Sequence, residues 1–256
     1  MKKITIKNRK GLKLVILPEI KPKQKGLVFI MHGFGGFKEQ KHIQAMANAF
    51  KKEKYSIVRF DTTNSLGESG GKTIKATITQ YYNDLKDVIN WSSKQNWYIE
   101  PFTLAGHSAG GQCILFFAEN YPLKVKALVP FGANISSQLL RRVFSKKELD
   151  VWKNKGYKER VSHSKAGVII KTSWLFMLDM DKYDILKKTH ELTMPILLIV
   201  GSQDDSCPVY QQRMLYKKLP GPKELNIIKG APHTFRENKH LIILKRLIKA
   251  WVKKYL

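Results

Sequence analysis

The stretch Phe102-Thr103-Leu104-Ala105-Gly106-His107-Ser108-Ala109-Gly110-Gly111 holds a serine with a glycine two positions before it and another two positions after it. An apolar run enters the serine, and a helix-forming run, residues 112–120, leaves it. A Gly-x-Ser-x-Gly segment between a strand and a helix is typical of a strained turn that exposes the serine hydroxyl at a sheet edge. The glycines are expected where a side chain would collide with the neighbouring strand or helix. The stretch therefore predicts Ser108 as a nucleophile; the alternative is an ordinary tight turn.

The bulk composition fits one large α/β domain over residues 1–256. Apolar residues make up 43% and aromatic residues 11%, which is typical of a globular chain. We expect no membrane-spanning helix and no signal peptide, because no apolar run is long enough. Cys113 and Cys207 have no metal-like spacing, and Cys113 is expected to be a small buried residue. These features favour a reduced, cytoplasmic setting.

The net charge of +26 raises the question of a polyanionic partner. Of the 46 basic residues only 8 are arginines, so 38 are lysines. Recognition of phosphates and bases by shape favours arginine, and here lysines are spread along nearly every expected helix and loop. We therefore expect a solvated lysine surface with weak, salt-dependent binding to polyanions and no specific nucleic-acid site.

Strand-like and helix-like segments alternate along most of the chain, which requires crossover connections and a mostly parallel sheet. Residues 3–7 and 12–17 are expected to form an antiparallel hairpin at the sheet edge. The apolar run 27–31 predicts a strand buried on both faces. Further strands are expected over 55–60, 102–107, 125–131, 195–200 and 224–228, and helices over 39–52, 77–94, 209–219 and 237–255. The sequence thus predicts an α/β fold with an eight-stranded sheet flanked by helices.

The alternation stops after the sixth strand and resumes near Pro195. The intervening residues 133–194 are too many for a plain connection, so we expect a small inserted cap. Helices are predicted there over Ser145–Lys155 and Asp181–Thr189. Its aromatic residues would either line a substrate pocket or pack onto the main domain. The last helix has an apolar stripe opposite lysines, which favours packing on the sheet over binding to a membrane.

A serine nucleophile needs a base, and the base needs an acid that orients it. His233 follows the strand 224–228 through a glycine-containing turn and precedes the last helix, so it is the expected base. Two carboxylates, Asp204 and Asp205, follow the strand 195–200. Asp204 is expected to be the acid because it lies three residues after Gly201. Asp205 would then face solvent or cap a helix.

The transition state of acyl transfer needs two N–H donors around its oxyanion. Ala109, directly after the nucleophile, is expected to supply one donor, and Phe34 in His32-Gly33-Phe34-Gly35-Gly36 is expected to supply the other. His32 would brace this loop. His107 would point away from the nucleophile. The residues predicted as candidates to line the substrate pocket are Phe34, His107, Trp174 and Phe176.

Taken together, these motifs resemble the α/β-hydrolase superfamily. The closer resemblance is to bacterial cinnamoyl/feruloyl esterases and serine-aminopeptidase-like hydrolases, and it covers nearly the whole chain. The resemblance implies a Ser108–His233–Asp204 triad, an oxyanion hole formed by the amides of Phe34 and Ala109, and a cap after the sixth strand. That group often has glutamine after the serine, where this chain has Ala109, so a side-chain contribution to the pocket is lost.

The expected activity is hydrolysis of a small-molecule carboxylic ester through an acyl-enzyme, without a metal or organic cofactor. Amide (aminopeptidase-like), thioester and lysophospholipid hydrolysis are alternatives, because the fold alone does not choose the bond. A non-enzymatic alternative is a basic polyanion-binding protein. Both a monomer and a homodimer are compatible with the sequence.

Overall fold

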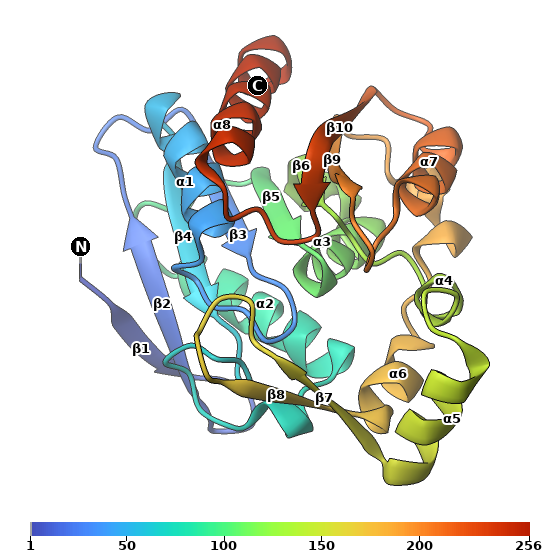
Figure 1. The fold of residues 1–256 in the computed structure, drawn as a ribbon. Coiled ribbons are helices and arrows are strands. Elements are labelled where there is room, and N and C mark those ends of the chain that lie inside the picture. Colours follow the sequence, from blue (N-terminus) through green and yellow to red (C-terminus); the bar gives the residue numbers. More distant parts are fainter. Residues whose placement is uncertain (1) are drawn as a thin grey trace.

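An eight-stranded sheet runs through the computed structural model, which describes residues 2–256. Its strands lie in the order β1-β2-β4-β3-β5-β6-β9-β10 (Figure 1). They span Ile4–Lys7 (β1), Lys13–Glu19 (β2), Leu27–Met31 (β3), Ser56–Asp61 (β4), Phe102–His107 (β5), Val125–Phe131 (β6), Ile196–Gln203 (β9) and Lys223–Pro232 (β10). Strand β2 pairs antiparallel with β1 and β4, and all the other pairs are parallel. The predicted mostly parallel eight-stranded sheet, with a hairpin at its edge, is confirmed.

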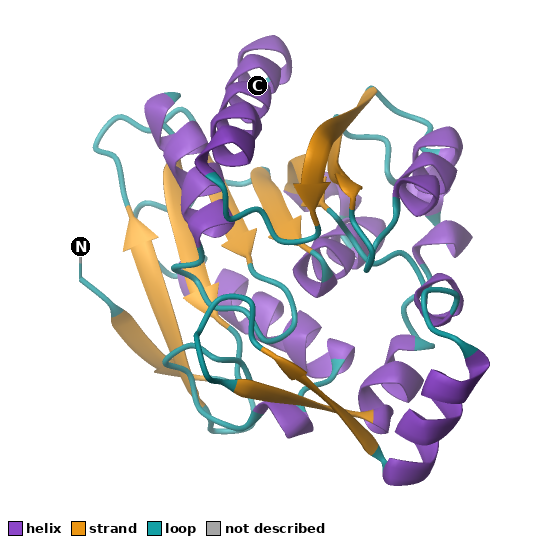
Figure 2. Ribbon diagram, viewed as in Figure 1, coloured by secondary structure: helices purple, strands orange, loops and turns teal. Residues whose placement is uncertain are grey.

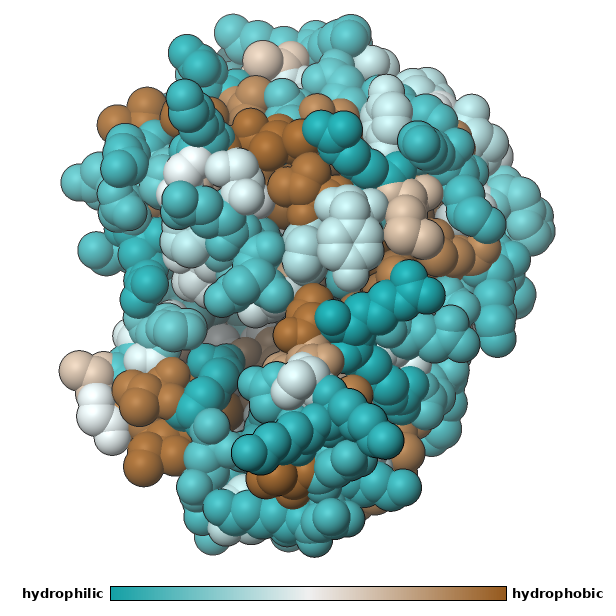
Figure 3. All heavy atoms as spheres, turned by 45° about the vertical axis from the view of Figure 1, so that its right-hand side comes forward, coloured by the Kyte–Doolittle hydropathy of each residue, from teal (hydrophilic) through white to brown (hydrophobic). Residues whose placement is uncertain are grey.

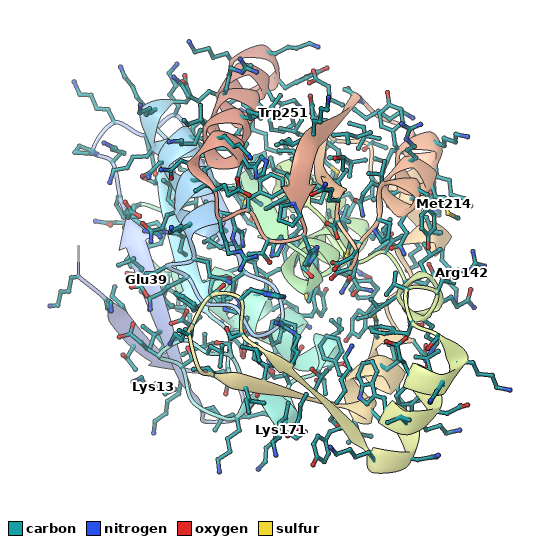
Figure 4. All side chains as sticks on the ribbon, viewed as in Figure 1. Lys13, Glu39, Arg142, Lys171, Met214 and Trp251 are labelled. Carbon is teal, nitrogen blue, oxygen red and sulfur yellow. The ribbon has the colours of Figure 1, made fainter. Side chains whose placement is uncertain are left out.

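Helices cover both faces of the sheet (Figure 2). The helices outside the segment between β6 and β9 are α1 (Lys41–Lys52), α2 (Ile78–Ser92), α3 (Ala109–Asn120), α7 (Val209–Lys218) and α8 (Asn238–Tyr255), with short 3-10 turns at Thr73–Lys75 (η1) and Pro122–Lys124 (η2). Helices α1 and α8 pack on one face, and α2 and α3 pack on the other. The prediction that the last helix packs on the sheet is therefore confirmed, and Trp251 of α8 (labelled in Figure 4) is only 1% exposed.

The core consists of two apolar clusters, one on each face of the sheet. Val28 and Ile30 belong to the cluster under α1 and α8, whereas Phe29 and Met31 belong to the cluster under α2 and α3. Successive side chains of a strand point to opposite faces, so a strand covered on both sides must be apolar throughout. This explains the unbroken apolar run of β3. Cys113 in α3 is fully buried, as expected.

The segment 132–195, which we call the insertion, lies between β6 and β9 at the edge toward which the parallel strands point (Figure 1). It contains α4 (Ser137–Arg141), α5 (Lys146–Lys155), β7 (Tyr157–Val161), β8 (Ile169–Ser173), α6 (Trp174–Met180), η3 (Ile185–Lys187) and η4 (Thr189–Glu191). Strands β7 and β8 form an antiparallel hairpin of their own. The helix predicted over Ser145–Lys155 is confirmed as α5. A Ser145–Glu148 capping box starts it, and Gly156 ends it with a φ of 77°.

The helix predicted over Asp181–Thr189 is wrong: this segment forms only short 3-10 turns. Helix α6 already ends at Met180, and the Asp184 carboxylate accepts the N–H of Leu186 at the start of η3. The N–H of Ile185 donates to the carbonyl of Ile135 at 3.0 Å, which removes it from any helical ladder. Contacts distant in sequence thus override the local helical preference.

Lysine side chains project outward around most of the molecule, as Lys13 and Lys171 do in Figure 4. This agrees with the expected solvated lysine surface. Among residues 2–256, no helix is long and apolar enough to cross a membrane.

Candidate active site

Ser108 lies at the turn between β5 and α3, and its backbone is strained. Its φ and ψ are 56° and −119°, a region that non-glycine residues rarely adopt. Such a conformation costs about 1–3 kcal/mol and persists only where the surroundings enforce it. Here the Ser108 N–H donates to the Phe131 carbonyl at 3.0 Å, and the Ser108 carbonyl accepts the N–H of Gln112 at 3.0 Å. The strain aims the side chain away from the sheet into the space at its edge.

Three glycines permit this turn, and close packing is the reason for each of them. A Cβ at Gly106 would lie 2.6 Å from the Gly110 carbonyl oxygen, and one at Gly110 would lie 2.5 Å from that of His32. A Cβ at Gly33 would lie 2.8 Å from the Cβ of Ser108. These distances are shorter than side chains tolerate, which agrees with the collisions expected from the sequence.

His233 and Asp204 lie next to each other at the ends of two neighbouring strands. Pro232 of β10 pairs with Gln203 of β9 after a register shift, so the next residue of each strand meets the other. The Nδ1 atom of His233 lies 2.8 Å and 2.9 Å from the two carboxylate oxygens of Asp204. The Asp204 side chain is completely buried, and that of His233 is 17% exposed. The imidazole is therefore held by its Nδ1, and its Nε2 forms no hydrogen bond in the described part of the chain.

Backbone groups complete the surroundings of the Asp204 carboxylate. Its Oδ1 also accepts the N–H groups of Ser206 at 3.0 Å and Cys207 at 2.7 Å. Gly132, with a φ of 48°, packs against the pair, and a Cβ there would lie 2.9 Å from Oδ2. Sequence reasoning missed the role of Gly132. The neighbouring Asp205 is exposed, and among the described residues it forms no hydrogen bond with His233, so only one of the two candidate carboxylates is bonded to the histidine.

Ser108 and His233 both line one cavity, although no hydrogen bond joins their side chains within residues 2–256. Catalytic hydrogen bonds are often long or misaligned in unliganded enzymes and tighten when the substrate binds. The Ser108 hydroxyl also lies near the fully buried thiol of Cys207. Burial raises the pKa of that thiol well above its usual value, and contact with Ser108 partly opposes the shift.

Two backbone N–H groups are available beside Ser108. Ala109 is the first residue of α3, and the N–H groups of the first helical turn have no partner within the helix. The Phe34 N–H donates to no protein carbonyl among residues 2–256. Phe34 lies in the same loop as Gly33, which packs so closely on Ser108 that it has no room for a Cβ. Both predicted donors thus border the serine.

Two buried histidines hold the surrounding loops. The N–H of Thr62 donates to Nε2 of His32 at 3.1 Å, so the proton of His32 is on Nδ1, which donates to the Gly33 carbonyl at 2.8 Å. His32 therefore braces the loop, as expected. His107 turns away from Ser108, and its Nε2 lies 3.0 Å from the His233 carbonyl oxygen. A carbonyl can only accept, so this nitrogen carries the proton. Burial lowers the pKa of both side chains, which keeps them neutral.

The cavity has a volume of about 540 Å³ and lies between the sheet edge and the insertion. Figure 3 shows the surface hollowed between an upper and a lower part of the molecule, with hydrophobic residues inside the hollow. Three of the four predicted pocket residues, Phe34, His107 and Phe176, line this cavity. Trp174 does not: it packs against Trp152, which lines the cavity in its place. The Phe34 and Phe176 rings are 4.8 Å apart, so an aromatic wall connects the loop to the insertion.

The insertion also contributes cations that sequence reasoning missed. Lys158 and Arg160 of β7 line the cavity, and the Arg160 guanidinium donates to the Phe34 carbonyl at 3.4 Å. No local pattern marks residues 157–161 as a strand, so nothing in the sequence indicated that both side chains would share one face. No group of three or more His, Cys, Asp or Glu side chains in the described chain is arranged to hold a metal ion.

Comparison with known proteins identifies the fold. The structure superposes with a TM-score of 0.83 on "Ferulic Acid bound to Est1E from Butyrivibrio proteoclasticus", at 20% identity over 98% of each chain. The mouse α/β hydrolase domain-containing protein 10 gives a TM-score of 0.82, at 17% identity over 99% of each chain. In sequence, the chain is 27% identical over 210 residues to a protein of Mycoplasma genitalium whose name proposes an esterase or lipase; 73% of this chain and 75% of that protein are covered.

The family described as "Serine aminopeptidase, S33" matches residues 22–172, more than half of the chain. The match includes the loop with Phe34 and the turn with Ser108, and it extends into β8 of the insertion. The chain is therefore an α/β hydrolase and belongs to this serine aminopeptidase S33 family.

Proposed function

We propose that the protein is a serine hydrolase that cleaves carboxylic esters of small molecules, with Ser108 as nucleophile, His233 as general base and Asp204 as the orienting acid. The observation that carries the proposal is that His233, joined to the buried Asp204 at 2.8 Å, lines the same cavity as the strained Ser108. A serine hydroxyl needs such a base, and the base needs a partner that fixes its tautomer.

The residues support a two-step reaction. The Ser108 hydroxyl attacks the ester carbonyl while Nε2 of His233 takes its proton, and Asp204 stabilises the imidazolium through Nδ1–H. The tetrahedral intermediate collapses, the alcohol leaves with the proton from Nε2, and an acyl-serine remains. Water then loses a proton to Nε2 and attacks the acyl group, which releases the acid and restores the hydroxyl.

The negative charge of the tetrahedral intermediate needs donors that are already in place. The N–H groups of Ala109 and Phe34 border Ser108 from the helix end and from the loop, and we assign them to the oxyanion hole. The positive end of the α3 dipole adds to the attraction. We assign the insertion as a cap, because it closes the cavity opposite the sheet edge.

An ester is favoured as the bond because of the name of the Mycoplasma genitalium relative and the likeness in fold to Est1E. The family description also names an aminopeptidase, so an amide is the competing bond. A panel of 4-nitrophenyl esters of rising chain length, a feruloyl ester and an aminoacyl anilide separates the two. We expect turnover of the esters and little turnover of the anilide; the reverse order would replace the ester with an amide.

A fluorophosphonate probe tests the nucleophile directly. The wild type should be labelled at Ser108, and Ser108→Ala should be unlabelled and should lose activity by about 10⁶-fold. Ser93→Ala, a change at an exposed serine after α2, is the control and should label normally. Equal labelling of Ser108→Ala would remove Ser108 from the mechanism.

A gel shift at ~0.15 M salt tests the polyanion-binding alternative. Tight binding of a nucleic acid at this salt concentration would support that alternative.

A further inference from the structure

In the hairpin of the insertion, the charged side chains of β7 lie on two faces, one toward the cavity and one away from it. Successive side chains of a strand point to opposite sides, so Lys158 and Arg160 share one face of β7, and Ser162 follows directly after the strand. These three residues line the cavity, whereas Tyr157, Glu159 and Val161 do not. On the outer face Glu159 is paired with Lys171 of β8 at 3.1 Å and with Lys155 at 3.8 Å. The outer lysines thus share a protein carboxylate as their partner.

The inner cations have no such partner. Within residues 2–256, neither Lys158 nor Arg160 forms an ion pair. Two carboxylates line the cavity, Glu148 and Asp205. Both are exposed; Glu148 accepts hydrogen bonds from Ser145, and Asp205 accepts one from Ser206. The inner face therefore presents two positive charges to the cavity without a protein anion bound to either.

Two buried cations elsewhere in the chain, Lys38 and Arg59, have a structural role, and each is paired with a buried carboxylate. The fully buried Lys38 contacts the carboxylate of Asp61 at 2.7 Å, and the pKa of its ammonium is raised. Arg59 is likewise paired with the buried Glu19. For Lys158, burial and the nearby Arg160 together lower the pKa to about 8, and Glu148 only partly opposes this shift. The lysine at the cavity is therefore held in an environment that would gain from an added anion.

Aromatic rings surround the Lys158 ammonium without neutralising it. The ammonium lies 3.8 Å from the Phe144 ring centre and 4.3 Å from that of Trp152. These contacts fix the side chain but leave its charge unpaired, and they provide an apolar wall for the carbon skeleton of a ligand. Arg160 lies at the other end of this face, where its guanidinium reaches the Phe34 carbonyl. Lys158 thus lies beside the rings of the insertion, and Arg160 lies beside the loop that packs on Ser108.

From this geometry we infer that the substrate is an ester with a separate carboxylate group, which Lys158 and Arg160 bind. The inference rests on the proposed ester hydrolysis and names its substrate class. A planar guanidinium and an ammonium on one strand face match the oxygens of a carboxylate, and charge-assisted hydrogen bonds are stronger than neutral ones. Once bound, this carboxylate would orient the ester carbonyl toward Ser108 from within the cavity.

Two matched pairs of esters test this. On the acyl side, mono-4-nitrophenyl adipate is compared with methyl 4-nitrophenyl adipate; on the alcohol side, 4-acetoxybenzoate is compared with its methyl ester. In at least one pair, we expect the wild type to favour the charged ester in kcat/KM by about tenfold or more. The pair that responds tells on which side of the scissile bond the carboxylate lies. A wild type that favours the neutral ester in both pairs would overturn the inference.

Variants assign the preference to the inner face. In Lys158→Met/Arg160→Met, the ratio of charged to neutral turnover should fall to about that of the non-enzymatic reaction. Because the ratio is taken within one variant, a general loss of activity does not disturb it, and Lys158→Met alone gives a second reading if the double variant folds poorly. Lys171→Met, on the outer face, should keep the wild-type ratio. A preference that persists in the double variant would contradict the inference.

A binding measurement separates this inference from the proposed function. Adipate should raise the melting temperature of the wild type and of Lys171→Met, and should leave that of Lys158→Met/Arg160→Met unchanged. If neutral esters are cleaved and adipate does not bind, the inference fails and the hydrolase stands. If no ester is cleaved and the probe does not label Ser108, the proposed function fails whatever adipate does.

Discussion

The α-carbon of Gly33 packs against Ser108 so closely that a Cβ added to it would lie 2.8 Å from the Cβ of the serine. The carbonyl oxygen of His107 would also lie close to this added Cβ, at 3.1 Å. The loop that holds Phe34 is thus fixed relative to the proposed nucleophile by direct contact. Any side chain at position 33 must push the two apart.

Gly33→Ala should therefore lower kcat by about 10²–10³-fold, the usual cost of one oxyanion donor, because the Phe34 N–H moves away from the reacting oxygen. Steady-state kinetics with a 4-nitrophenyl ester measure the effect. Gly70→Ala is a matched control, since a Cβ there meets nothing closer than 3.6 Å and should change nothing. Full activity in Gly33→Ala would remove Phe34 from the oxyanion hole.

The two adjacent carboxylates provide a test of the proposed acid. Asp204→Asn should lower kcat by about 10⁴-fold, because the amide supports the wrong histidine tautomer. Asp205→Asn should remain close to wild type on a neutral ester, since Asp205 is exposed and bonded to Ser206. Circular dichroism should show both variants folded. An Asp204→Asn enzyme with normal kcat would exclude the assignment of this residue.

His107 acts on the backbone of the proposed base, because its Nε2–H donates to the His233 carbonyl at 3.0 Å. His107→Phe keeps a ring of similar shape and removes this bond, so kcat should fall by roughly two- to tenfold with KM unchanged. The pH profile of kcat should keep its shape, because no reacting group is lost. His42→Phe is the control, since the buried Nε2 of His42 has no partner to lose. A change in KM alone would point to the pocket wall instead.

Much of this arrangement could be predicted from residue patterns, and the physical reasons are specific. The strand β3 is buried on both faces, so its five residues had to be apolar, and such a run is recognisable. The turn at Ser108 tolerates only glycine at three packed positions, which leaves a readable motif. The positions of Asp204 and His233 followed from the order in which parallel strands end.

The insertion could not be predicted in the same way. Strand β7, Tyr157–Val161, has charged or polar groups on both faces, because one face borders a cavity and the other faces solvent. It therefore lacks the apolar alternation by which a strand is recognised. Helix α6 depends on packing between segments that are distant in sequence. The same packing explains why Trp152, and not Trp174, lines the cavity. Such contacts leave no periodic trace in the local sequence.

The pKa of Lys158 gives the carboxylate preference a pH dependence. Burial and Arg160 of β7 lower this pKa to about 8, Glu148 of α5 opposes the shift, and the Phe144 and Trp152 rings face the ammonium. The cation is present below pH 8 and is lost as the pH rises through that value. The charged-to-neutral ratio in kcat/KM should therefore fall above about pH 8 and level off at a lower value, because Arg160 stays charged. A ratio that rises with pH would contradict the assignment of Lys158.

The buried Glu119 in the last turn of α3 predicts a loss of stability as the pH rises. Burial raises its pKa from 4.5 to about 8; Asp184 and Glu191 act in the same direction, and Lys188 opposes them. Because the folded pKa lies above the unfolded one, the folded state binds the proton more tightly. The stabilisation is complete below about pH 4.5 and is lost as the pH rises through about 8. Over that window this group lowers the free energy of unfolding by up to about 1.4 kcal/mol per pH unit.

Glu119→Gln replaces the carboxyl with an amide that does not titrate, so the variant should lose this pH dependence. Urea unfolding at pH 5, 6.5 and 8 should give wild type and variant similar stabilities at the lowest pH. The variant should then become progressively more stable than the wild type as the pH rises. Glu237→Gln, at an exposed carboxylate that does not act on Glu119, is the control and should follow the wild-type curve between pH 5 and 8. A constant difference between Glu119→Gln and wild type at all three pH values would show that Glu119 keeps an ordinary pKa, because a group that is ionised throughout contributes no slope.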